Sequence, residues 1–209
     1  MTTDYENLKV WRRICKTTLS NYINMEKRLS DSKKMSDFVL VYYSIFLIIH
    51  SLTALCFEWY NGKLCEYFGI VLSVIMLAYS LINSNANYAQ RIERITKAIN
   101  DLKTLKRNLK EEQLDLFISE YNEIVDNVEF RNDLDFFHTV KSLCKEKEIN
   151  CFKKVSAFEA GEDKEKEKIR NYLSEISPIL LQIKIIANWM LKIFLCILPI
   201  VIMVVCTVF

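Results

Sequence analysis

The sequence has very few of the residues that end helices and make tight turns. Its 209 residues include only 3 Gly and 2 Pro, whereas average usage of about 7% and 5% would give about 25. Sandwiches, barrels and glycine-rich phosphate-binding loops depend on such residues. We therefore predict a mostly helical protein and exclude phosphate binding by a glycine-rich loop.

The residues of common catalytic and metal sites are also sparse. The two histidines belong to none of the usual nucleotide-binding, nucleophile-elbow or zinc-protease motifs. His138, Cys144 and Cys151 lie within fourteen residues, but they contain no CxxC pair and no fourth ligand is evident. They are interpreted as helix-face residues. The sequence thus predicts no catalytic, cofactor-binding or metal-binding residue, and we expect a protein that is not an enzyme.

Charge and cysteine content argue against two further classes. The net charge of +2 gives no general reason for nucleic-acid binding, and aromatic residues do not interleave with the basic residues of 91–110. Seven cysteines in 209 residues are too sparse for a secreted disulfide scaffold. Neither direct nucleic-acid binding nor a disulfide scaffold is therefore predicted.

The apolar residues are segregated into three blocks. The mean hydropathy is +0.09 although 26% of the residues are charged. Residues 38–57 carry no charged side chain and reach the length of about 20 residues that spans a bilayer. Residues 67–84 form a second uncharged block, and the turn signal Asn61-Gly62 lies between the two. The two blocks predict a transmembrane helical hairpin.

Lys and Arg flank this hairpin asymmetrically. Residues 1–37 hold eight basic side chains and residues 85–110 hold seven, whereas the connecting loop holds only Lys63. The positive-inside rule then places both flanks in the cytoplasm. The polar residues 1–37 precede the first span, so no signal peptide is expected. We expect a multi-pass protein of the inner membrane with a cytoplasmic N-terminus.

The third apolar block, residues 177–209, allows two interpretations. It begins at Ser177-Pro178, a typical helix start. A polar stripe follows at Lys184, Asn188 and Lys192. The uncharged residues after the stripe are interrupted by Pro199. Either an interfacial helix continues into a third span, or the whole helix lies on the membrane surface or against a partner.

Two segments beside the hairpin carry heptad-like seams. In residues 3–30 the seam positions alternate spacings of three and four, at Leu8, Trp11, Cys15, Thr18, Tyr22, Met25 and Leu29. Residues 88–109 have the same spacing, interrupted only at Lys106. Their seam positions are Tyr88, Ile92, Ile95, Ile99, Leu102 and Leu109. Both segments leave the membrane on the same side, so we expect the two seams to pair.

The remaining polar residues predict further helix. In residues 111–135, which are acidic, one helical face is formed by Leu114, Phe117, Tyr121, Ile124 and Val128. The charge run at residues 160–168 predicts a solvated connector. The expected organisation is an N-terminal helix, a hairpin, a cytoplasmic helical region and a C-terminal interfacial or transmembrane helix, at residues 1–37, 38–84, 85–176 and 177–209.

Polar and small residues within the spans suggest functional positions. His50 either lines a water-filled path or hydrogen-bonds a neighbouring helix. A stripe of small and polar residues favours close helix packing or, in an oligomer, a lumen; it comprises Gly69, Ser73, Ser80, Ser84 and Asn87. Cys56 and Cys65 lie at the outer end of the hairpin, either as a disulfide or as two free thiols.

Several short motifs follow this layout. The helix after the hairpin opens with the residues Asn87-Tyr88-Ala89-Gln90-Arg91, and Tyr121 begins the run Tyr-Asn-Glu-Ile-Val. Glu129, Asp135 and Phe136 fit a pattern in which Glu-Asn-His precedes Asp and an aromatic residue; Phe130 and Arg131 stand in place of Asn and His. In layout and motifs, residues 5–150 resemble the SLATT family.

The resemblance implies a membrane effector of a prokaryotic anti-phage system. Such effectors are understood to oligomerise and to perforate or depolarise the membrane of their own cell in abortive infection. The implied partners are the lipid membrane, further copies of the chain, and a separately encoded sensor such as a nucleotidyltransferase or reverse transcriptase. The alternative is a non-conducting membrane scaffold or regulatory partner that anchors a cytosolic enzyme.

Two sets of candidate residues follow from the spans and from the resemblance. The pore or helix-packing candidates are His50, Gly69, Ser73, Ser80 and Ser84. The candidates for cytoplasmic assembly or gating are Tyr88, Arg91, Tyr121, Glu129 and Asp135.

Overall fold

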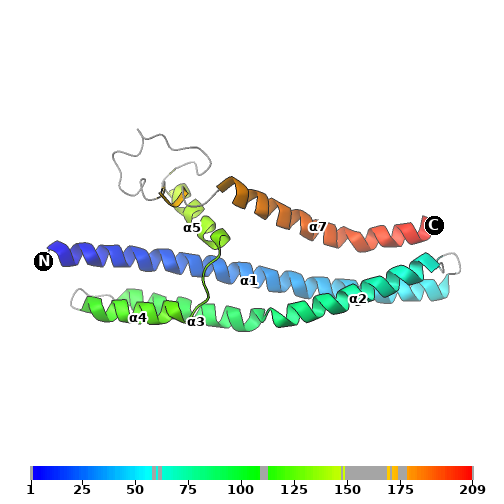
Figure 1. Ribbon diagram of the computed structural model, residues 1–209, viewed down its shortest axis with the longest axis horizontal. Helices are drawn as coiled ribbons and strands as arrows, with labels where there is room; N and C mark the ends of the chain where they lie inside the picture. Colours follow the sequence, from blue (N-terminus) through cyan, green and yellow to red (C-terminus); the bar gives the residue numbers. More distant parts are fainter. Residues whose placement is uncertain are drawn as a thin grey trace. The chain divides into compact units, whose positions relative to one another are not determined.

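The chain folds into long helices. The computed structural model describes residues 2–57, 60, 63–108, 113–146, 148, 169, 171–173 and 178–208, and over these residues it contains no strand. The elements are α1 (Thr2–Cys56), α2 (Lys63–Asn85), α3 (Tyr88–Asn108), α4 (Leu114–Asp126), α5 (Asp133–Glu146) and α7 (Pro178–Val208) (Figure 1). Asn61-Gly62, Leu109, Cys151, the charge run at 160–168 and Ser177 lie outside the described residues.

Three helical stretches are long and apolar enough to cross a membrane. They are Glu6–Cys56 in α1, Cys65–Asn108 in α2 and α3, and Pro178–Val208 in α7. An uncharged helix of about 20 residues satisfies all of its backbone hydrogen bonds internally, which is what the bilayer core requires. The predicted all-α membrane fold is therefore confirmed.

The helices form two compact units, which we describe separately. The polar unit comprises Met1–Ser30 and Ala89–Ile183, and the apolar unit comprises Asp31–Tyr88 and Lys184–Phe209. The helix α1 contributes its first part to the polar unit and the remainder to the apolar unit. Between α2 and α3, Asn87 has a φ of 47°. Asn tolerates this left-handed conformation better than most residues, so the helix ends here without a glycine.

In the polar unit the two predicted seams face one another. The seam residues of α1 are buried at Leu8, Cys15, Tyr22, Met25 and Leu29. The helix α3 contributes a buried face at Ile95, Ala98, Ile99, Leu102 and Leu105. The buried thiol of Cys15 donates to the Leu102 carbonyl at 3.8 Å. Leu105 takes the inward position beside the exposed Lys106, which accounts for the interruption in the seam.

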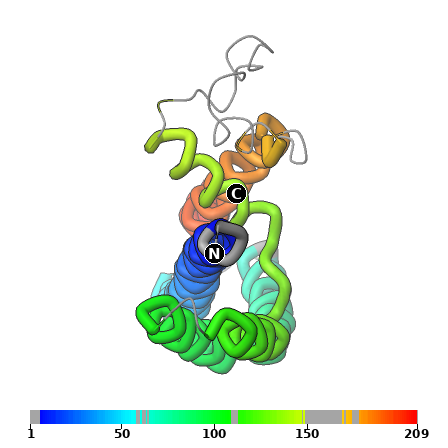
Figure 2. The backbone as a smooth tube through the Cα atoms, turned by 90° about the vertical axis from the view of Figure 1, so that its left-hand side faces the viewer, coloured from blue at the N-terminus to red at the C-terminus, as the bar shows by residue number. Residues whose placement is uncertain are grey.

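The helices α3 and α4 lie on one side of the N-terminal part of α1, and α5 lies on the other (Figure 2). The aromatic rings of α4, Phe117 and Tyr121, pack edge-on against Trp11 at centroid distances of 6.3 and 5.5 Å. The helix ends at Asp126, so Val128 lies in the connection to α5 and does not continue the predicted helical face.

The apolar unit packs parts of α1, α2 and α7 around one core. Its buried residues are Val39, Tyr43, Phe46, Tyr60, Cys65, Leu72, Ile202 and Cys206. The outward faces of the same helices remain exposed and apolar, for example at Ile48 in α1, Leu77 in α2 and Val204 in α7. An exposed helix face that is apolar is typical of a helix that contacts lipid.

Candidate functional site

His50 occupies the core of the apolar unit. Its side chain is 4% exposed, with Nδ1 at 2.7 Å from the Tyr60 hydroxyl and Nε2 at 3.0 Å from the Cys65 carbonyl oxygen. A carbonyl oxygen only accepts, so Nε2 carries the hydrogen; in the neutral ring Nδ1 then accepts from Tyr60. A Cβ added at Gly69 would lie 3.5 Å from the imidazole. Both nitrogens are used within the protomer.

The serines of the stripe lie on the exposed surface of α2. Ser73, Ser80 and Ser84 are exposed, whereas Gly69 is partly buried against His50. The Ser73 hydroxyl donates to the Gly69 carbonyl at 2.8 Å, one turn earlier in the same helix. Exposed apolar residues surround these hydroxyls, among them Ile70, Val74 and Leu77. The arrangement presents small polar groups on an otherwise apolar helix.

Pro199 creates the clearest long-range contacts of the apolar unit. Proline has no N–H to donate to the residue four positions earlier, which here is Leu195. The Tyr43 hydroxyl on α1 donates to the Leu195 carbonyl at 2.8 Å, and the Tyr42 hydroxyl donates to the Cys196 carbonyl at 2.9 Å. A carbonyl at membrane depth has no water to bond, so loss of its donor is destabilising. The two tyrosines therefore donate hydrogen bonds to α7 where Pro199 interrupts its backbone hydrogen bonds.

Cys56 at the end of α1 and Cys65 near the start of α2 form no disulfide with one another. Cys56 is exposed and Cys65 is buried, and both are free. The Cys65 thiol instead donates to the Cys206 carbonyl in α7 at 3.8 Å. Among the described residues, no group of three or more His, Cys, Asp or Glu side chains could hold a metal ion.

Asp135 is the central polar residue of the contact between α1 and α5. Its side chain is 1% exposed, and Arg28 binds it with Nε–Oδ1 and Nη2–Oδ2 distances of 2.9 and 3.0 Å. The Asn132 N–H also donates to Oδ2 at 3.1 Å, as in a capping box at the start of a helix. Asn24 donates to the Asp135 carbonyl and to the Thr139 hydroxyl.

Arg91 and Glu129 form a second paired site, between α3 and the connection after α4. Arg91 Nε lies 3.1 and 3.0 Å from the two Glu129 carboxylate oxygens, and Nη2 lies 2.8 Å from one of them. Both side chains are about one-third exposed, so solvent weakens this pair relative to that of Asp135. Tyr88 is half-buried at the first residue of α3.

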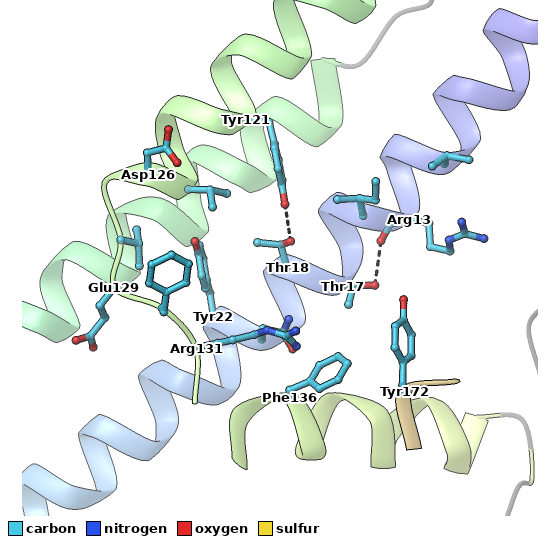
Figure 3. A pocket seen from close by; sticks show the side chains of 16 residues that line it. Arg13, Thr17, Thr18, Tyr22, Tyr121, Asp126, Glu129, Arg131, Phe136 and Tyr172 are labelled. Atoms are coloured by element: carbon cyan, nitrogen blue, oxygen red, sulfur yellow. Dashed lines mark hydrogen bonds between the residues drawn. The ribbon is translucent and has the colours of Figure 1, made fainter. Parts of the chain in front are cut away.

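Tyr121 joins α4 to α1 at the edge of a groove (Figure 3). Its hydroxyl lies 2.7 Å from that of Thr18, and burial raises the pKa of Tyr121. The groove has a volume of about 590 Å³ and is lined by α1, α4, the connection between α4 and α5, Phe136 and Tyr172. Four of the five candidates for assembly or gating thus make hydrogen bonds within the polar unit.

Sequence reasoning missed the partners of several of these residues. In the sequence Arg28 is one of the eight basic residues before the first span, and nothing in its neighbourhood indicates Asp135, 107 positions later. The tyrosine pair 42–43 was not singled out. A usable signal existed, since a proline within an apolar helix leaves a carbonyl to be satisfied and hydroxyl groups within another span can satisfy it.

A family model matches most of the chain. The family model described as SMODS and SLOG-associating 2TM effector domain family 5, a SLATT family, matches residues 4–205. The match extends beyond residues 5–150, where the motifs lie, and includes most of α7. No curated protein and no solved structure matches the chain.

Proposed function

The chain belongs to SMODS and SLOG-associating 2TM effector domain family 5, and on this basis we propose that it is an oligomeric, pore-forming membrane effector. It depolarises the inner membrane of its own cell in an abortive-infection response to phage. A separately encoded sensor, such as a nucleotidyltransferase or reverse transcriptase, controls it, and it needs no catalytic step of its own. The observation that carries this proposal is the exposure of Ser73, Ser80 and Ser84 on an apolar helix.

Several copies are needed because side chains fill the core of the apolar unit over the residues that the structure describes. Its three helices meet in a core filled by side chains such as Tyr43, Phe46 and Leu72. The buried imidazole inside it is also used, since His50 bonds Tyr60 and Cys65. The exposed serines of α2 are the polar groups that neighbouring copies can bring together around water.

The polar unit is assigned to the cytoplasm. The basic residues beside the hairpin support this orientation through the positive-inside rule. The helix α7 is assigned as a third span, supported by its length and by the bonds from Tyr42 and Tyr43 at Pro199. In this topology the C-terminus lies on the outer face.

A pair of matched substitutions tests the conducting path. Ser73 on α2 and Ser44 on α1 are both exposed, and each hydroxyl donates to the carbonyl one turn earlier. We expect Ser73→Leu to abolish depolarisation on induction with the partner, because it places an isobutyl group in the path. Ser44→Leu should leave depolarisation unchanged. The measurement is the fluorescence of a membrane-potential dye, with membrane content of each variant checked by immunoblot.

The scaffold alternative predicts a different result for substitutions of these serines. A protein that only anchors a cytosolic enzyme tolerates Leu at both Ser73 and Ser80. Growth arrest with unchanged membrane potential in the parent protein, or full depolarisation by Ser73→Leu, would exclude the pore and favour the scaffold.

A further inference from the structure

The groove of the polar unit has the dimensions and lining of a small-molecule site. Its volume of about 590 Å³ lies within the range of about 300–1,000 Å³ typical of ligand pockets. Aromatic rings form much of its wall, with Tyr22, Tyr121, Phe136 and Tyr172 drawn in Figure 3. Such walls suit a flat ring, because aromatic pairs stack or meet edge to face.

A buried polar atom in this wall lacks a hydrogen bond. Asn21 lines the groove and is 5% exposed, and its Oδ1 has no hydrogen-bond partner among the described residues. Buried amide oxygens are nearly always bonded. The oxygen has almost no accessible surface, so a turn of the Asn21 amide toward the groove would let a ligand N–H or O–H supply the missing donor.

The neighbouring Tyr22 keeps its own hydroxyl proton. Burial, and after it the proximity of Tyr121 and Asp126, raises the pKa of Tyr22 to about 12. The hydroxyl is therefore neutral at physiological pH and remains a hydrogen-bond donor.

A cation also lines the groove. The Arg131 guanidinium stacks on the Phe136 ring at 3.7 Å from its centroid, as Figure 3 shows. Among the described residues no carboxylate lies within ion-pairing distance of Arg131, whereas Glu129 is already paired with Arg91. A guanidinium that stacks on a ring still presents its N–H groups at the edge, where a carboxylate or a similar anion can bind.

The same groove disfavours a strongly charged ligand. Asp126 lines its α4 end and carries a negative charge, and no cation among the described residues pairs with it. Arg13 and Arg131 are the cations of the lining, and Glu129 is paired with Arg91. Without that pair, the charged side chains of the groove sum to one positive charge, which a single anionic group balances. One anionic group toward Arg131, with a hydrogen-bond donor on the ring toward Asn21, fits the charges that are present.

We propose that this groove binds a small planar monoanion carrying an N–H or O–H donor, and that this ligand regulates the effector. The regulatory part rests on the proposed function, whereas the binding part does not. The groove is formed by α1, α4 and the connection before α5, so a bound ligand holds these three elements together. The helix α1 continues without a break to Cys56, which makes it the element through which binding can act.

Indole-3-acetate is a suitable probe, since it has a flat ring, one N–H and one carboxylate. Binding to the full-length protein in lipid nanodiscs is measured by saturation-transfer NMR, with empty nanodiscs as the blank. We expect 1-methylindole-3-acetate, which lacks the N–H, and 3-methylindole, which lacks the charge, each to bind about tenfold more weakly. ATP is the polyanion control and should not compete.

Two variants with matched controls locate the binding. Asn21→Leu removes the acceptor at nearly constant volume, and Arg131→Gln removes the charge; each should weaken indole-3-acetate binding about tenfold. Asn100→Leu and Arg107→Gln, at exposed positions of α3, should leave it unchanged. Circular dichroism confirms that each variant is folded.

The outcomes separate the site from its regulatory role. Weaker binding in both groove variants and not in the controls supports the site, whether or not the protein depolarises membranes. Equal binding in all four variants, absence of binding to the parent protein, or tighter binding of ATP overturns it. If the site is supported and Ser73→Leu also blocks depolarisation, unchanged depolarisation by Asn21→Leu overturns the regulatory role alone.

Discussion

At the scale of single residues, buried charge is concentrated at one point of the polar unit. Asp135 accepts from Arg28 and from the Asn132 backbone, so both carboxylate oxygens are satisfied away from water. A buried pair of this kind adds little net stability over an apolar pair of the same size, but removal of one partner leaves an uncompensated charge. It therefore specifies which turn of α5 meets α1.

The Arg28–Asp135 pair gives a prediction about stability. Arg28→Met should lower the free energy of unfolding of the polar unit by about 3–5 kcal/mol, because Asp135 then stays buried without its cation. Thermal denaturation followed by circular dichroism in detergent would measure the change. Lys27→Met, one position earlier and exposed, is the control and should change the free energy by less than about 0.5 kcal/mol. Equal melting of the two variants would contradict the role given to the pair.

At the scale of elements, the helices could be predicted and most of their contacts could not. The uncharged runs and the three-and-four spacing place α1, α2, α3 and α7 with little ambiguity, because both depend on neighbours in sequence. The pairing of Tyr43 with the Leu195 carbonyl spans 152 positions, and only the fold brings them together. The end of α4 at Asp126 was also missed, since Val128 keeps the helical spacing after the helix has ended.

The proline break in α7 gives a prediction about coupling between two helices. Tyr43→Phe should destabilise the apolar unit by about 1 kcal/mol, because it leaves the Leu195 carbonyl unpaired. In a Pro199→Ala background the alanine N–H can bond that carbonyl within the helix, so Tyr43→Phe should then cost much less. Unfolding by SDS in mixed micelles, followed by tryptophan fluorescence, measures all four members of the cycle. If the destabilisations by Tyr43→Phe and Pro199→Ala are additive, the Tyr43 hydroxyl does not compensate for the hydrogen bond that is missing at Pro199.

At the scale of the whole molecule, the proposed topology of three spans places the two ends of the chain on opposite sides of the membrane. We expect a periplasm-active reporter fused after Phe209 to be active and one fused after residue 176 to be inactive. A cytoplasm-active reporter at the same two positions should give the reverse pattern. Activity of the cytoplasmic reporter at both positions would mean that α7 lies on the surface, with two crossings as the family description states.

The hydrogen bond from Ser73 to the Gly69 carbonyl has a further consequence, for kinetics. Because the hydroxyl is already satisfied at the Gly69 carbonyl, the exposed face of α2 can meet lipid or water without a new hydrogen bond and without refolding. If protomers assemble as complete units, the rate-limiting step is their collision in the plane of the membrane. The rate of depolarisation would then rise more steeply than linearly with the number of copies per membrane area. A cell would therefore tolerate a basal level of the protein and respond sharply above it.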